Sequence, residues 1–141
     1  MKTKTYQLSI QEKTRVLQAL AGELNKREDI LFAYAYGSFA EENDLPVHDI
    51  DVGVYVAAIE QRGATPYALE LGALLSKISP VPAHVVVVNH APIPFLYQVI
   101  SGTVVFSRNE EVRSRVAEHA ISRYLDIKPL LLQGLKEAFA A

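Results

Sequence analysis

Two short motifs between residues 37 and 51 contain the side chains best suited to chemistry. The first is Gly37-Ser38, which follows the apolar run from Ile30 to Tyr36, and the second is Asp49-Ile50-Asp51. A glycine and a serine that end a strand can bring free backbone N–H groups close to a phosphate. Two carboxylates at positions i and i+2 of a strand point to the same face and repel each other unless a cation lies between them. Together the motifs predict a site for a nucleotide and a hard divalent cation such as Mg²⁺.

Each motif also has an ordinary structural explanation when it is taken alone. A Gly-Ser pair is typical of a tight turn, and Asp-x-Asp is typical of the polar edge of an exposed strand. The combination favours the functional interpretation. The motifs follow the order strand, Gly-Ser, loop, strand with Asp-x-Asp, so a turn suited to phosphate and a carboxylate pair suited to a cation occur close together in the sequence.

The composition predicts one globular domain spanning residues 1–141, with 21% charged residues and no cysteine. The lack of cysteine excludes a thiolate metal site and a cysteine nucleophile. The formal net charge is −2 and no basic run is present, which argues against a polynucleotide partner. No apolar run approaches the roughly 18 residues of a membrane span, and the N-terminus lacks the apolar core of a signal peptide, so we expect a cytoplasmic protein without a membrane partner.

Hydrophobic periodicity and turn residues predict alternating helices and strands. Ser9 and Glu12 have capping-box spacing at the first helix, and Pro129 is expected to bend the last one. Tyr34 and Tyr36 are expected in the core. The predicted fold class is α/β (α+β), with a small mixed sheet flanked by helices. The expected helices cover about residues 9–29, 38–42, 65–77, 93–101 and 110–139, and the expected strands about residues 30–36, 49–57, 83–89 and 103–106.

The order and spacing of the two motifs resemble those of the DNA polymerase beta-like nucleotidyltransferases, and especially their minimal, single-domain members. The resemblance implies attack on the α-phosphorus of ATP with release of pyrophosphate. It assigns nucleotide binding to Gly37 and Ser38, and it assigns Asp49 and Asp51 as catalytic residues that hold Mg²⁺ or Mn²⁺. Two such ions can stabilise the attacking and leaving oxygens.

His84 departs from the pattern of this family. The segment Pro82-Ala83-His84-Val85-Val86-Val87-Val88-Asn89-His90-Ala91-Pro92 is similar to the family's strand of the form V-D-V-V-V-L-N-D-A-P, and its register places His84 where the family has a third carboxylate. A neutral imidazole offers one acceptor instead of two anionic oxygens, yet it can serve as a general base. His84 is therefore the third candidate catalytic residue, and it leaves open whether full activity is retained.

The end of the chain extends the resemblance. Residues 123–129, RYLDIKP, are similar to the closing helix of minimal nucleotidyltransferases that are encoded beside HEPN-domain proteins. In that family the nucleotidyltransferase is the antitoxin, which transfers AMP from ATP to a tyrosine of the HEPN ribonuclease toxin. The run Leu130-Leu131-Leu132 is a candidate contact with such a partner. Two alternatives stay open, a degenerate antitoxin that neutralises by binding alone and a small-molecule nucleotidyltransferase of the aminoglycoside-modifying type. Homo-oligomerisation also stays open.

Overall fold

The computed structural model describes residues 4–140. Helices and strands alternate along these residues in the predicted order. The elements are α1 (Ile10–Asn25), β1 (Ile30–Tyr36), the short 3-10 helix η1 (Ser38–Ala40), β2 (Ile50–Val56), α2 (Gln61–Ile78), β3 (Ala83–Val87), α3 (Ile93–Ile100), β4 (Thr103–Ser107) and α4 (Glu110–Ala138).

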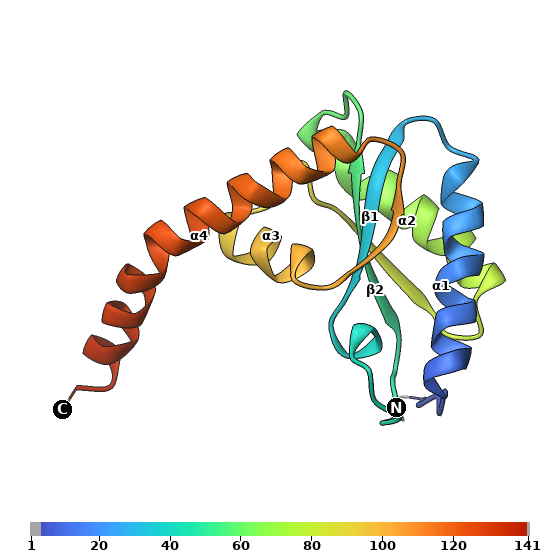
Figure 1. The fold of residues 1–141 in the computed structure, drawn as a ribbon, viewed down its shortest axis with the longest axis horizontal. Coiled ribbons are helices and arrows are strands. Elements are labelled where there is room, and N and C mark those ends of the chain that lie inside the picture. The colour runs from blue at the N-terminus through green and yellow to red at the C-terminus, as the bar shows by residue number, and fades with distance from the viewer. Residues whose placement is uncertain (1–3, 141) are drawn as a thin grey trace.

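The four strands form one mixed sheet in the order β3-β2-β1-β4. Strand β1 is antiparallel to both β2 and β4, whereas β2 and β3 are parallel and are connected through α2. A parallel pair requires such a crossover, because the chain must return to the same end of the sheet. Helices lie on both faces of the sheet, with α1 and α2 on one side and α3 and α4 on the other (Figure 1). The predicted fold class is confirmed.

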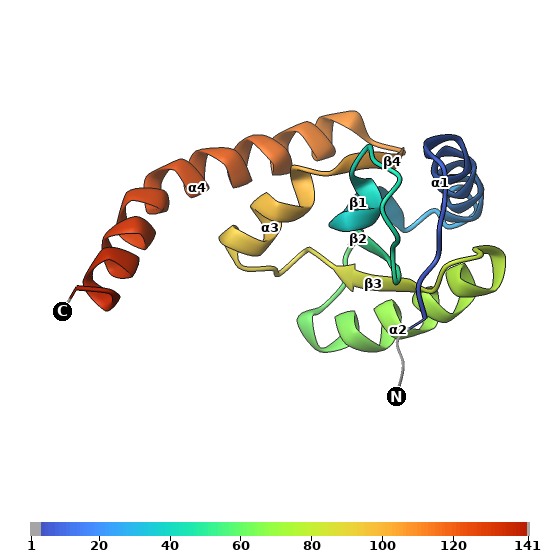
Figure 2. The same cartoon turned by 90° about the horizontal axis from the view of Figure 1, so that it is seen from below.

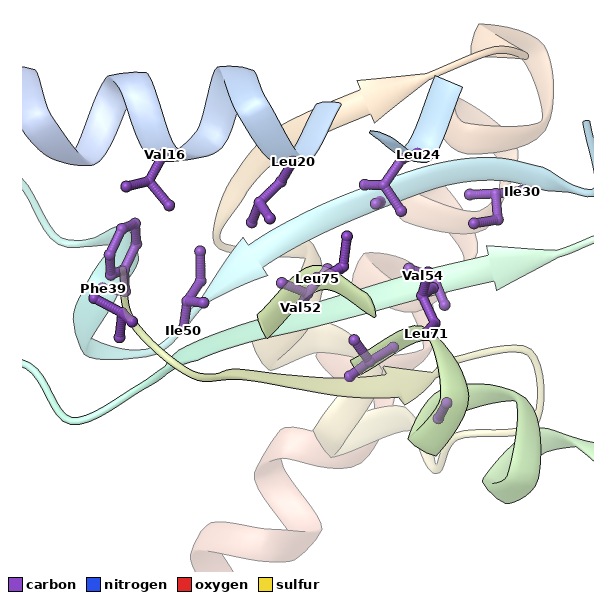
Figure 3. Packing of buried hydrophobic residues seen from close by; sticks show 14 of the residues in the cluster. Val16, Leu20, Leu24, Ile30, Phe39, Ile50, Val52, Val54, Leu71 and Leu75 are labelled. Carbon is purple, nitrogen blue, oxygen red and sulfur yellow. The ribbon is translucent and has the colours of Figure 1, made fainter. Parts of the chain in front are cut away.

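The larger part of the core lies between the sheet and the pair α1 and α2. Helix α1 places an apolar stripe of Val16, Leu20 and Leu24 against the sheet, and α2 contributes Leu71 and Leu75 (Figure 3). These side chains recur at helical spacing, as an amphipathic helix on a sheet requires. Ser9 and Glu12 form the predicted capping box at the start of α1.

The second face carries the polar site as well as a smaller apolar cluster. Strand β1 presents Phe32, Tyr34 and Tyr36 to this face, and α3 packs on it through Leu96 and Val99. Gly53 of β2 lies beneath α3, where a Cβ atom would come within 2.6 Å of Val99 Cγ1. The absence of a side chain at Gly53 therefore lets α3 approach the sheet closely.

Several boundaries differ from the predicted ones. Helix α1 ends at Asn25 rather than near residue 29, and α2 begins at Gln61, one turn before the expected start. Pro66 lies inside α2, although proline favours the first turn of a helix. Strand β3 ends at Val87 instead of Asn89, because the Asn89 side chain pairs with the N–H and C=O of Val56, at 2.9 and 2.7 Å, where a strand backbone would otherwise continue.

Helix α4 begins on the sheet and then extends away from it (Figures 1 and 2). Its direction changes in the second half, which contains Pro129, as predicted. Between residues 4 and 140, no helix combines the length and apolar character that crossing a bilayer requires.

Candidate active site

The Gly37-Ser38 motif forms the turn at the end of β1. Gly37 has φ 76°, in the left-handed region that favours glycine, and the 3-10 helix η1 begins at Ser38. Ser38 is exposed, while the next residue, Phe39, is buried in the core and anchors the turn. A 3-10 helix, like an α-helix, leaves its first N–H groups without partners inside the helix. The turn therefore offers backbone donors and a hydroxyl at the surface.

Gly37 also makes room for a carboxylate, which the sequence did not reveal. A Cβ atom at position 37 would lie 2.8 Å from Asp51 Oδ2. We expected glycine here because a side chain would block the approach of backbone to phosphate. In the structure, a side chain at this position would also collide with Asp51, so the two motifs touch each other directly.

Asp51 lies at the centre of the site. It pairs with Tyr36 across the antiparallel β1–β2 ladder and with His84 across the parallel β2–β3 ladder. Partial burial raises the pKa of Asp51, the hydrogen bond from His84 lowers it, and the charge of Asp49 raises it, with a net shift upward. Asp49 lies one residue before β2 rather than inside it as predicted, yet its carboxylate still acts electrostatically on Asp51.

Tyr36 belongs to the site as well as to the core. Its ring packs edge-on against Phe95, with 5.7 Å between ring centres. Burial, followed by the charges of Asp51 and Asp49, raises the pKa of Tyr36 to about 12, so its hydroxyl keeps its proton at neutral pH. The sequence predicted only the packing role. The signal that could have revealed the second role is its position directly before Gly37, at the end of a strand that pairs with Asp-x-Asp.

His84 lies on β3 with its side chain exposed and directed at Asp51. Its Nδ1 atom is 3.3 Å from Asp51 Oδ1. An ionised carboxylate can only accept, so Nδ1 is the donor in this hydrogen bond and Nε2 is left as the acceptor. The structure thus places His84 beside Asp51, on the strand next to β2.

The side chains present suit a hard divalent cation. The candidate donors are the carboxylate oxygens of Asp49 and Asp51, which repel each other without a cation, and Mg²⁺ is commonly held by one or two carboxylates plus substrate phosphates. Over residues 4–140, however, no group of three or more His, Asp or Glu side chains is arranged to enclose a metal. The donor set thus fits a metal that is completed by substrate oxygens, and not one enclosed by protein alone.

A hollow adjoins the Gly-Ser turn on the side away from β2. Its volume is about 340 Å³. The side chains of Gln98 from α3, of Ser101 directly after that helix and of Thr103 from β4 give it polar groups. The complete lining is Gly37, Ala40, Glu41, Gln98, Ser101, Gly102 and Thr103. The sequence did not predict that α3 lines this hollow. The apolar pattern of α3 does not show which end of the helix lies next to the Gly-Ser turn.

Comparison with known proteins agrees with this geometry. The sequence matches the family described as "Polymerase beta, Nucleotidyltransferase" over residues 18–111, which is most of the chain. No curated protein matches it in sequence.

Solved structures share the fold at low sequence identity. One is a complex of a tri-AMPylated HEPN toxin from Shewanella oneidensis with its MNT antitoxin (16% identity, TM-score 0.63, 92% of this chain and 98% of that chain). Others are the toxin–antitoxin pair MntA–HepT (15%, 0.62, 92% and 98%) and a toxin–antitoxin structure with AMP-PNP (16%, 0.65, 94% and 100%). At these identities the likeness establishes the fold, and the family match establishes the lineage. This chain belongs to the polymerase beta nucleotidyltransferase family.

Proposed function

We propose that this protein is a metal-dependent nucleotidyltransferase that acts as an antitoxin, transferring AMP from ATP to a tyrosine of a HEPN ribonuclease toxin. The observation that carries the proposal is the contact between the two motifs. The Asp51 carboxylate lies against Gly37 and between Tyr36 and His84, so the phosphate-binding turn and the acidic residues form one continuous site. The structural relatives that include an AMPylated HEPN toxin and a bound AMP-PNP support the choice of ATP and of the acceptor.

The roles of the residues follow from their positions. The N–H groups after Gly37 and the Ser38 hydroxyl donate to the phosphates of ATP. Asp49 and Asp51 would hold Mg²⁺ or Mn²⁺, which supplies charge neutralisation at the reacting phosphate and the leaving pyrophosphate. Tyr36 keeps its proton beside both carboxylates and adds no negative charge to the site.

His84 is suited to accept the proton of the attacking tyrosine hydroxyl. The hydrogen bond from Nδ1 to Asp51 fixes the tautomer and leaves the Nε2 lone pair free, as a carboxylate does for a catalytic histidine. The oxygen of the acceptor tyrosine then forms a bond to the α-phosphorus while the bond to pyrophosphate breaks. General-base help of this kind is worth about 10²–10⁴-fold in rate.

The acceptor has to come from another protein, and α4 is the surface we assign to it. Leucines at positions 125, 132 and 135 and Phe139 follow one another at spacings of three, four or seven residues, so they form one stripe, and all are exposed. A groove of about 840 Å³ between Pro129 and Ala140 runs along this part of the helix. The predicted contact run, residues 130–132, lies in the same region and is exposed as well.

The decisive experiment is transfer of label from α-labelled ATP to the co-encoded HEPN protein, with wild type and His84→Asp. If His84 is the working base, the aspartate variant should be equally active or slower. If His84 merely replaces a lost metal ligand, aspartate should accelerate transfer. His90→Asp, a change of the same kind on an exposed residue of the following loop, serves as the control.

The same assay separates the alternatives. No label transfer by either protein, together with intact toxin neutralisation, would contradict catalysis and leave a binding-only antitoxin. Transfer to an aminoglycoside but not to a HEPN protein would instead indicate a small-molecule enzyme.

A further inference from the structure

Lys13 of α1 is the one charged residue that is buried among those described between positions 4 and 140. Only 5% of its surface is exposed. Removing an ammonium group from water is costly unless hydrogen bonds replace its hydration. A buried lysine outside the catalytic motifs therefore calls for a specific role.

The hydrogen bonds of the Lys13 ammonium go to the segment that follows the Gly-Ser turn. Its Nζ atom donates to the backbone carbonyl of Glu41 at 3.3 Å and to that of Asn43 at 3.0 Å. It also lies 5.7 Å from the centre of the Phe39 ring. Within the described part of the chain, no carboxylate oxygen comes within 4.0 Å of this ammonium. The ammonium group therefore interacts with two backbone carbonyls and an aromatic ring, all of which belong to residues 39–43.

The rest of the connection between the motifs is fixed by a different element. The N-terminal segment pairs with it through two backbone hydrogen bonds between Tyr6 and Val47, at 2.8 and 3.0 Å. Gln7 adds a hydrogen bond to the carbonyl of Asp44. Residues 44–47 therefore have their own attachment. Lys13 and the buried Phe39 ring attach residues 39–43, which lie next to the Gly-Ser turn.

We infer that Lys13 is a positioning residue for nucleotide binding. By bonding to residues 41 and 43, and through its contact with Phe39, it holds η1 in the conformation in which Ser38 and the first N–H groups face the phosphates. Lys13 acts through this segment and does not touch the nucleotide. The inference rests on the proposed function, because it assumes that the turn at Gly37 and Ser38 binds ATP.

The test is calorimetric titration of Mg-ATP into wild type, Lys13→Met, Lys13→Gln and Lys13→Arg. Methionine keeps the length and apolar stem but removes the donors, so we expect binding weaker by about tenfold or more, since a hydrogen bond to a charged group is worth more than a neutral one. Glutamine keeps an NH₂ group with two donors, so the Kd of Lys13→Gln for Mg-ATP should lie between those of wild type and Lys13→Met. Arginine keeps the charge and the donors, so the Kd of Lys13→Arg should be within about threefold of the wild-type value. Lys77→Met, on the exposed last turn of α2, should leave the Kd unchanged.

Kinetics and spectroscopy distinguish positioning from simple stabilisation. Lys13→Met should raise the KM for ATP in AMP transfer more than it lowers kcat, and hydrogen exchange of residues 38–43 should speed up in the folded variant. Equal Kd values for wild type and a folded Lys13→Met protein would overturn the inference, and so would a failure of both Lys13→Met and Lys13→Gln to fold. If wild type itself does not bind Mg-ATP, the proposed function is what fails.

Discussion

Asp51 on β2 and Leu132 on α4 lie in opposite kinds of surroundings. Asp51 is flanked by Tyr36, Gly37 and His84, all supplied by the same chain. Leu132 is 56% exposed, and Phe139, seven residues or about two helical turns further along the chain, is 86% exposed. Large apolar side chains that remain exposed in a contiguous stripe usually mark a surface that another molecule covers. The contrast supports our proposal that the chain itself supplies the groups for phosphate transfer and that its acceptor belongs to another protein.

The largest expected effect is a loss of AMP transfer through the aspartates, with partner binding by α4 left intact. Asp49→Asn combined with Asp51→Asn removes both proposed metal ligands, and loss of several kcal/mol of charge stabilisation corresponds to a decrease in AMP transfer of about 10³-fold or more. Calorimetry should show correspondingly weakened Mg-ATP binding. Size-exclusion chromatography should still show the complex with the HEPN protein, because α4 is unchanged.

Asp126→Asn on the exposed face of α4 is the control for this pair and should bind Mg-ATP as wild type does. A double variant that binds Mg-ATP with wild-type affinity would show that the assignment of Asp49 and Asp51 is wrong.

Substitutions on α4 should have the opposite pattern, with weaker binding of the partner and unchanged binding of Mg-ATP. Leu132→Asp with Leu135→Asp places two charges in the middle of the apolar stripe, where both leucines are more than half exposed. Central interface residues typically contribute about 2 kcal/mol or more, so partner affinity should fall by at least about 30-fold while Mg-ATP affinity stays constant. Titration of each ligand in turn measures both quantities.

Ile10→Asp provides the matched control, since Ile10 is 51% exposed at the start of α1, where an acidic residue is well tolerated. If the two leucine substitutions leave the HEPN complex intact but convert a dimer into a monomer, the stripe joins two copies of this chain instead.

The smallest expected effect concerns stability. Because burial raises the pKa of Asp51, the folded protein binds this proton more tightly than the unfolded chain, and ionised Asp51 destabilises the fold at neutral pH. Asp51→Asn should therefore raise the melting temperature at pH 7 by about a few degrees, even though it lowers AMP transfer. The gain should shrink as the pH falls through the raised pKa of Asp51 towards the ordinary carboxyl value of about 4. A variant that melts below wild type at pH 7 would show that the hydrogen bond with His84 outweighs the cost of burial.

The sequence predicted the elements that depend on local patterns. The capping box of Ser9 and Glu12 and the strand that ends directly before Gly37 could be predicted because each requires only neighbouring residues. The position of His84 next to the carboxylates was predicted from the resemblance to the family's strand. It could not be derived from the chemistry of the residues alone.

The contributions that escaped prediction all depend on tertiary contacts. Tyr36 carries the same apolar signal as Tyr34, and only strand pairing places its hydroxyl beside two carboxylates. Lys13 lies in a helix of otherwise ordinary amphipathic pattern, where a lysine normally faces solvent. Its burial follows from the position of the segment after η1, which no local pattern specifies.

The parallel pairing of β2 with β3 has a consequence for the order in which the protein matures. Asp51 and His84 are 33 positions apart and become neighbours only after α2 has crossed the sheet. During synthesis, a chain that has emerged only through β2 already carries Gly37, Asp49 and Asp51 but lacks the imidazole. Non-local parallel contacts form late, since the chain entropy of the crossover must be lost before they are gained. The proposed catalytic set is therefore complete only after β3 has joined the sheet, and a product that terminates before β3 would carry both aspartates without the residue that we assign as the base.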